Sequence, residues 1–151
     1  MTIAELIERD YISAYKAKDR QRLDTLRLLK TAVKNRQVEL RRSQESPEDA
    51  TMLEVIGQQA KQRQDSIEQF TAAGRADLAA KEAAEMAILK SYLPEPLSPE
   101  ALDQAVSAAI QATGAKDMKG MGAVMQAVMS AHKGQVEGKQ LSALVRARLA
   151  S

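Results

Sequence analysis

The sequence predicts an all-α protein with a four-helix N-terminal region followed by a three-helix C-terminal bundle. Two observations predict this class. The apolar residues are almost all Ala, Leu, Ile, Val and Met, with only three Tyr and one Phe, and strong helix formers dominate the polar residues too. In addition, apolar positions recur every three or four residues, and no segment sustains the alternation that is typical of a strand.

The first two helices are expected at residues 3–18 and from Asp19 to about Arg42. Thr2 and Glu5 have the spacing of a capping box, in which each side chain hydrogen-bonds a backbone N–H of the other residue. Asp19 is a suitable N-cap for the second helix, because its carboxylate accepts from the first free amides. The apolar stripe of this helix consists of Leu23, Leu26, Leu29, Val33 and Leu40.

The third and fourth helices are expected on either side of Gly74. Ser46 can cap the third helix, with Pro47 at its first position, where the missing N–H costs nothing. Gly74 suits the end of this helix because glycine adopts left-handed backbone conformations readily. The fourth helix follows at about residues 76–92. The periodicity suggests that Ile67 of the third helix is buried, and the full apolar stripe is Leu53, Ile56, Ala60, Ile67 and Phe70.

Two closely spaced prolines, Pro94 and Pro96, predict a domain boundary. Proline cannot continue a helix, and it favours an extended conformation in the residue before it. We therefore predict an N-terminal domain at residues 1–92, a linker at 93–98 and a C-terminal domain at 99–151.

Three helices are expected in the C-terminal domain. The first begins after Ser98 and stops at Gly114, and the second ends before Gly134. The second helix carries a methionine stripe that is either part of the core or a pliable surface for a partner helix. The stripe consists of Met118, Met121, Met125 and Met129. The third helix is marked by Leu141, Leu144, Val145 and Leu149.

Residues for catalysis, cofactor binding or metal binding are scarce. The chain has no Cys, and its single histidine, His132, has no evident partner, so no nucleophile and base form a pair. Glu82 and Glu85 share a helix face, where pairing with Arg75 or Lys81 is the simpler interpretation than metal binding. The sequence therefore predicts no catalytic residue, no cofactor and no metal.

The location predicted from the sequence is cytoplasmic. The first ten residues include three acids and no apolar run, which is unlike a signal or transit peptide. No stretch approaches the roughly 20 apolar residues that a membrane span requires. The absence of Cys favours a reducing compartment.

Charge is distributed unevenly along the chain. Residues 16–42 contain ten Lys and Arg against three acids, whereas residues 43–100 contain five against eleven. Within the basic segment a row of cations repeats every seven residues, with Lys30 close to it. The row consists of Arg20, Arg27, Lys34 and Arg41. It is suited to a phosphate backbone, but the same cations are equally able to face the acidic segment of their own molecule.

Several motifs together resemble the GatB/YqeY-like family over essentially the whole chain. In the first domain they are Leu26-Arg27-Leu28-Leu29-Lys30, Lys61-Gln62-Arg63-Gln64-Asp65-Ser66-Ile67-Glu68 and Tyr92-Leu93-Pro94. In the second they are Met121-Gly122 with Val124-Met125 and Met129, followed by Lys133-Gly134 and Gly138-Lys139.

The resemblance implies a C-terminal domain similar to the tail of the B subunit of glutamine-dependent tRNA amidotransferases, which contacts tRNA. It also implies a family label of carbon–nitrogen ligase with glutamine as amide donor. This chain has neither a kinase-like nucleotide site nor an amidase Ser/Lys arrangement, so we expect no such activity from it alone. The basic residues that the resemblance brings forward as tRNA contacts are Lys119, Lys133, Lys139, Arg146 and Arg148.

Three functional hypotheses follow from the sequence. The first is a non-catalytic accessory or tRNA-binding protein, and the second is an adaptor that docks on a synthetase or an amidotransferase subunit. The third is the carbon–nitrogen ligase activity that the resemblance implies.

The sequence departs from the family motif at Ala123, Gln126, Gln135 and Glu137, and two of these changes remove positive charge.

Overall fold

The computed structural model describes residues 1–150, and within this range the secondary structure is entirely helical. The prediction of an all-α fold is confirmed. The chain divides into two compact units, Met1–Leu93 and the part that begins at Pro94. Each unit has its own apolar core. The boundary between the units lies at the Leu93–Pro94 bond.

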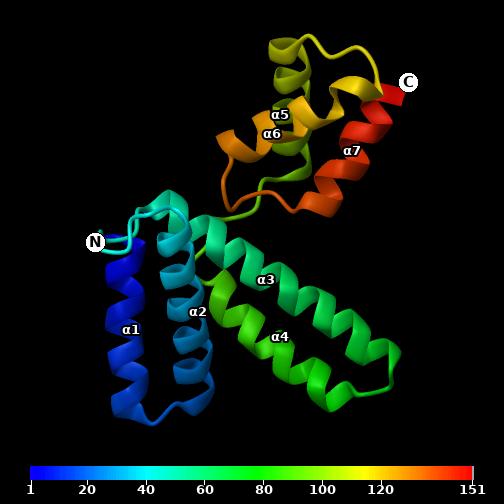
Figure 1. Ribbon diagram of the computed structural model, residues 1–151. Helices are drawn as coiled ribbons and strands as arrows, with labels where there is room; N and C mark the ends of the chain where they lie inside the picture. The colour runs from blue at the N-terminus through cyan, green and yellow to red at the C-terminus, as the bar shows by residue number, and fades with distance from the viewer. Residues whose placement is uncertain (151) are drawn as a thin grey trace. The chain divides into compact units, whose positions relative to one another are not determined.

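The first unit opens with α1 (Ile3–Ala17) and α2 (Arg20–Glu39), which lie side by side in Figure 1. Both predicted N-caps are present. Thr2 and Glu5 form the reciprocal capping box, and the Asp19 carboxylate accepts from the backbone N–H of Arg22. These caps fix where both helices begin.

The end of α2 differs from the prediction, because the helix stops at Glu39 and does not reach Arg42. The N–H of Arg42 bonds to the carbonyl of Gln37 and that of Arg41 to the carbonyl of Val38, which is the Schellman pattern of a helix end. Arg41 takes a left-handed conformation with φ 58°. Leu40, predicted on the buried stripe, is 38% exposed.

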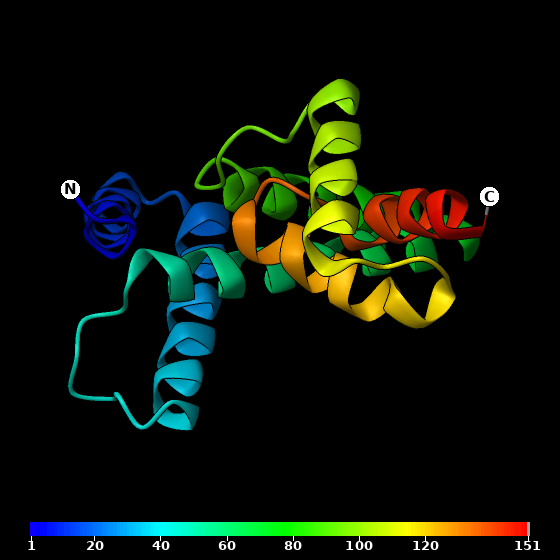
Figure 2. The ribbon, with the colours of Figure 1, turned by 90° about the horizontal axis from the view of Figure 1, so that it is seen from above.

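The second half of the unit is a helical hairpin of α3 (Asp49–Ala72) and α4 (Ala76–Lys90), visible as neighbouring helices in Figure 1. The prediction that Ser46 caps α3 is wrong. Figure 2 shows residues 40–48 as a loop, and the helix begins only at Asp49, whose carboxylate accepts from the N–H of Ile3. This long-range bond ties the start of α3 to α1.

The core of the first unit lies where all four helices meet. Fully buried side chains come from each of them, and on α3 the buried positions end at Ala60. Ile67 and Phe70, predicted in the same stripe, are only partly buried. The core cluster consists of Ile7, Leu26, Leu29, Val33, Met52, Val55, Ile56 and Leu89.

The second unit contains α5 (Pro99–Thr113), a short 3₁₀ turn η1 (Met118–Gly120), α6 (Met121–Ala131) and α7 (Gly138–Ala150). Ser98 caps α5 and Gly114 ends it with φ 70°, both as predicted. Figures 1 and 2 show α5 running across α6 and α7. The core consists of Leu102, Val106, Ala109, Val124, Val128, Leu141, Val145 and Leu149.

The predicted linker at residues 93–98 is bonded to the second unit. The N–H of Leu97 donates to the carbonyl of Gln135, whose side-chain amide donates to the carbonyl of Glu95. These bonds hold the segment after Pro94 against the α6–α7 connection. Among the described residues, no helix is both long and apolar enough to cross a membrane.

Candidate nucleic-acid interface

The basic row of α2 lies on the face of the helix that points away from the core. Arg20, Arg27 and Lys34 are exposed, whereas Leu26 and Leu29 on the opposite face are completely buried. Seven residues are almost two helical turns, so the three cations follow one line along the surface, about 10 Å apart. The core thus holds the row in a fixed orientation.

The acidic segment of the chain does not neutralise this row. Its carboxylates pair with cations beside the row: Glu54 lies 3.1 Å from Arg36, and Glu48 lies 3.2 Å from Arg42. Among the described residues, Arg20 and Lys34 have no carboxylate partner. These contacts agree better with an open basic surface than with pairing of the row to the acidic segment of the same molecule.

Arg27 has weak partners within the molecule. Asp24 of the same helix lies 3.6 Å from its guanidinium, and both side chains are more than half exposed. Such a surface pair contributes little, because solvent screens the attraction. The Tyr11 side chain raises the pKa of Arg27. Arg27 therefore keeps its charge and remains accessible.

Lys30 differs from the other cations near the row because it turns toward α1. Its Nζ lies 2.7 Å from the Glu8 carboxylate and 4.2 Å from the centre of the Tyr11 ring. An ion pair and a cation–π contact hold it between the two helices. Its charge serves the α1–α2 contact, so Lys30 is not an open cation.

Arg41 is exposed but does not belong to the helical face, because α2 ends two residues before it. The seven-residue spacing that predicts it as the fourth member of the row requires a continuous helix. Because its backbone is left-handed, the helical spacing no longer places Arg41 on the face of the row. Only Arg20, Arg27 and Lys34 therefore form the α2 row.

The basic candidates of the second unit fall into separate places. Arg148 donates to the carboxylate of Asp103 at 2.7 Å and to the hydroxyl of Ser107 at 2.6 Å, so its charge is used between α7 and α5. Lys139 also takes part in an intramolecular interaction. Lys119 and Lys133 are exposed and lie at opposite ends of the 11-residue α6, a helix about 16 Å long.

Arg146 is exposed on α7 and has no acidic partner among the described residues. Lys116, Lys119 and Lys133 are likewise exposed without an acidic partner in the described part of the chain, and these open cations come from several segments of the unit.

The motif residues of the second unit have identifiable structural roles. Gly134 has φ 77° and ends the turn after α6, while Gly138 starts α7. Gly122 is exposed and faces open space. Gly120 is the crowded glycine, because a Cβ there would lie 2.5 Å from the Cβ of Ala115.

The methionine stripe is divided between core and surface. Met121 and Met125 pack against the core of the second unit, whereas Met118 and Met129 are 43% and 41% exposed. The core interpretation therefore holds for Met121 and Met125, and a docking role of the two exposed methionines stays a prediction.

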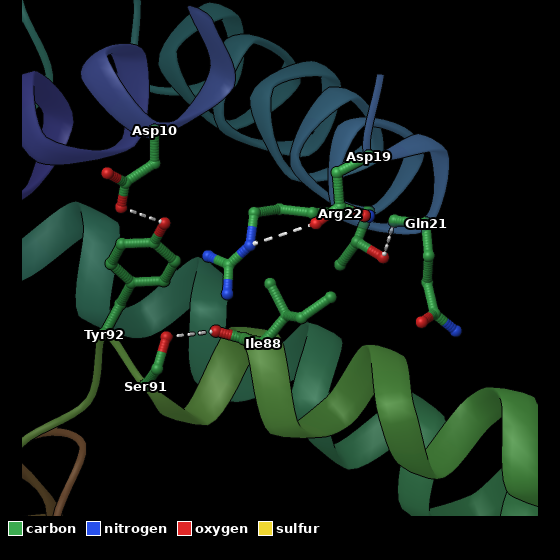
Figure 3. A network of polar contacts seen from close by, with 8 residues as sticks. Asp10, Asp19, Gln21, Arg22, Ile88, Ser91 and Tyr92 are labelled. Atoms are coloured by element: carbon green, nitrogen blue, oxygen red, sulfur yellow. Dashed lines mark hydrogen bonds and ion pairs between the residues drawn. The ribbon is translucent and has the colours of Figure 1, made fainter. Parts of the chain in front are cut away.

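Two polar clusters in the first unit were missed by sequence reasoning. In the first, the Tyr92 hydroxyl donates to the Asp10 carboxylate at 2.6 Å, and Figure 3 shows Arg22 beside this bond. The bond lowers the pKa of Asp10, whereas burial and the Asp10 charge raise the pKa of Tyr92 well above its usual value. The sequence signal that could have pointed to this cluster is a tyrosine two residues before Pro94, in a chain with few aromatic residues.

The second cluster lies between α3 and α4. Arg63 lies 3.2 Å from Glu85 and 3.7 Å from Glu82, and all three side chains are largely buried. The expected pairing of these glutamates with Arg75 or Lys81 is wrong, and Arg75 pairs with Asp77 instead. Among the described residues no group of three or more His, Cys, Asp and Glu side chains is arranged to hold a metal ion.

Known proteins resemble this chain over most of its length. A family model described as Yqey-like protein matches residues 4–149. The chain belongs to the YqeY-like family. This confirms the family resemblance drawn from the motifs.

Curated relatives of this YqeY-like chain come from yeasts. Altered inheritance of mitochondria protein 41, mitochondrial, of Saccharomyces cerevisiae (strain ATCC 204508 / S288c) is 34% identical over 113 residues, which are 74% of this chain and 60% of the relative. The protein of the same name in Lachancea thermotolerans is 32% identical over 103 residues, 67% of this chain and 54% of the relative. The chain thus spans about 60% or less of these relatives. Their names call them mitochondrial, and the cytoplasmic location of this chain stays a prediction.

Proposed function

We propose that this YqeY-like chain is a non-catalytic accessory protein that binds tRNA through the exposed basic row of α2. One observation supports the proposal above the others. Arg20, Arg27 and Lys34 form a line of accessible cations on a rigid helix, while the nearby carboxylates pair with Arg36 and Arg42. The family resemblance in the second unit suggests tRNA as the polyanion.

The affinity of such a surface is mainly electrostatic. Each phosphate contact releases about 0.7 to 0.9 counterions, so three contacts give a log–log salt slope of about −2 to −3. Lys119, Lys133 and Arg146 add to this slope where they reach the same RNA. Few aromatic side chains are exposed, so base stacking contributes little on the open face.

The test is a fluorescence-anisotropy titration with labelled tRNA at two salt concentrations. We expect saturable binding at low salt that weakens by at least tenfold between about 50 and 200 mM salt. The triple variant Arg20→Gln, Arg27→Gln, Lys34→Gln should lose most of this binding.

The matched control removes the same charge from another surface. Lys61, Lys81 and Lys90 are exposed on α3 and α4, and their triple change to Gln should leave binding nearly intact. Equal losses in the two triple variants, or no saturable binding of the wild-type chain at low salt, would contradict the proposal.

An adaptor function has support from a different observation. Leu28 and Val38 on the outer side of α2 are 55% and 57% exposed, and Met118 and Met129 are exposed on the second unit. Exposed apolar side chains are typical of a surface that docks a protein, such as a synthetase or an amidotransferase subunit. Recovery of the same protein partner after nuclease treatment, and its loss in Leu28→Ser with Val38→Ser, would favour this function.

The ligase activity that the family resemblance implies is tested separately. Incubating the purified chain with glutamine, ATP and a mischarged tRNA should yield no amide product. Amide formation by the chain alone would replace the accessory function with an enzymatic one.

A further inference from the structure

A groove runs along α2 next to the basic row, with a volume of about 500 Å³. It lies between α1, α2 and the loop that precedes α3. Its floor is formed by the partly exposed side chains of Ala4, Tyr11 and Pro47, and beneath them lie the buried core residues Ile7, Leu29, Val33 and Met52. Arg27, Lys30 and Lys34 line it from α2. The groove therefore combines an apolar floor with a cationic wall.

The acidic side chains in the groove each have a cationic neighbour. Glu8 is held by Lys30 at 2.7 Å, and Glu45 lies 3.5 Å from Arg42. Arg27 and Lys34 belong both to the groove and to the open row, so the groove is continuous with the proposed RNA surface. A ligand in the groove thus meets two cations whose charge is available.

Gln37 supplies a polar side chain to the groove lining. The residue is 5% exposed, and its Nε2 donates to the carbonyls of Arg42 and Glu45 at 3.0 and 3.2 Å. These two bonds fix the orientation of the amide. Its Oε1 accepts no hydrogen bond from the described residues. This oxygen is not sealed from solvent. Gln37 thus lines the groove with its amide held in place and with its acceptor oxygen unused.

We propose that this groove receives one unpaired nucleotide of the bound RNA. Its phosphate lies against Arg27 and Lys34, its base covers the apolar floor, and a donor on the base or ribose reaches Oε1 of Gln37. The proposal rests on the RNA-binding function proposed above and adds a preference for single-stranded RNA. Bases in a duplex are stacked and paired, so they cannot enter such a groove.

A nucleotide fits the groove better than an acidic peptide does. A peptide helix anchors through several apolar side chains over two turns or more, whereas about 500 Å³ is the size of a site for one small ligand. The uncharged acceptor of Gln37 favours a base or ribose donor and does nothing for a carboxylate. The groove also opens beside cations that a phosphate chain would follow.

The experiment compares two RNAs of equal phosphate number, an unstructured single strand and a hairpin duplex, with wild type and three variants. Ser43 is exposed and lines the groove, so Ser43→Phe should fill it without changing charge or core. We expect this variant to weaken single-strand binding at least tenfold and to leave duplex binding unchanged. Gln44→Phe, in the same loop but outside the groove, is the matched control and should change neither.

A third variant, Arg20→Gln, separates the groove from the row. Arg20 lies in the row and outside the groove, so both RNAs should lose affinity to a similar degree. In addition, titration with adenosine monophosphate should shift the Gln37 side-chain amide signals in a ¹H–¹⁵N spectrum of the wild type. The Ser43→Phe chain should show no such shift.

The outcomes distinguish the two proposals. If neither RNA binds saturably at low salt, the RNA-binding function itself fails. If both RNAs bind and Ser43→Phe leaves the single strand unaffected, the groove proposal fails while the basic row stands. If a glutamate-rich peptide binds the wild type but not Ser43→Phe, and the single strand is unaffected, the groove belongs to a protein partner and the nucleotide proposal is overturned.

Discussion

The two ends of the α3–α4 hairpin are stabilised by different forces. At its base, Met52, Val55 and Ile56 are buried against α1 and α2 and meet Leu89. Further along, the buried positions of α3 stop, and the two helices meet around Arg63 with its two glutamates. The comparison shows that one regular apolar stripe can run from a dry core into a mixed, partly wet contact.

The largest difference between the ends should appear when apolar side chains are removed. Leu29 of α2 is completely buried in the core against which the base packs, so Leu29→Ala should lower the free energy of unfolding by about 2–5 kcal/mol. Ile67 is only partly buried, so Ile67→Ala should cost about 1 kcal/mol. Urea denaturation followed by circular dichroism measures both. Equal losses would show that the outer half of the hairpin is as well packed as the base.

The charged cluster offers the next largest effect. Arg63→Leu leaves Glu82 and Glu85 facing each other without a cation, and we expect a loss of about 2 kcal/mol, since solvent still reaches part of the cluster. Amide exchange should quicken in the outer hairpin and stay slow at the base.

Replacing the whole cluster is the control for this effect. The Arg63→Leu, Glu82→Leu, Glu85→Leu variant should recover most of the loss, because no charge is left unpaired. The Nε of Arg63 and the Oε2 of Glu82 are buried without a hydrogen-bond partner, which indicates that the cluster already carries a desolvation cost. An Arg63→Leu chain as stable as wild type would remove any structural role for the cluster.

The bond between Tyr92 and Asp10 secures the base of the hairpin, where α4 ends near α1. Tyr92→Phe removes a hydrogen bond to a charged acceptor and should cost about 1.5 kcal/mol near neutral pH. Thermal and urea unfolding of the two chains at pH 7 measure this difference. Identical midpoints would mean that water replaces the hydroxyl without loss.

The same pair predicts how stability depends on pH. The pKa of Asp10 is lowered in the folded chain, so its contribution is present above the usual value of 3.8 and is lost as the pH falls through the folded pKa. The pKa of Tyr92 is raised, so its contribution is complete below its usual value of 10.0 and is lost as the pH rises beyond that. The difference in free energy of unfolding between wild type and Tyr92→Phe should therefore shrink at both low and high pH. A gap that is constant from acid to alkali would contradict this assignment.

Local signals in the sequence predict most of the helix boundaries. Thr2 with Glu5, Asp19, Ser98 and Gly114 act through bonds to their immediate neighbours, and their predicted roles are confirmed. Ser46 fails as a cap because the start of α3 is set by a contact with the distant Ile3. A signal that depends only on neighbours cannot report such a contact.

The candidate site was predictable in part. The seven-residue spacing places Arg20, Arg27 and Lys34 on one face, as the structure shows. It does not reveal that Lys30 turns to Glu8 or that Arg148 is held by Asp103, because these partners lie on other helices. The groove at Gln37 was not predictable either, since its lining comes from three separate segments of the chain.

The smallest predicted effects come from the backbone at two places, the tip of the hairpin and the turn that ends α2. Gly74 at the tip has φ 74° and open space around a would-be Cβ, so Gly74→Ala should cost about 1 kcal/mol through backbone conformation alone. Arg41, in the turn that ends α2, holds a similar left-handed angle of 58° with a side chain present. Arg41→Gly relieves that strain, but glycine also loses more entropy on folding, so the expected gain is only about 0.5 kcal/mol. Opposite signs in urea denaturation would support a conformational origin for both effects, whereas a loss in Arg41→Gly would mean that the arginine side chain makes a stabilising contact in that turn.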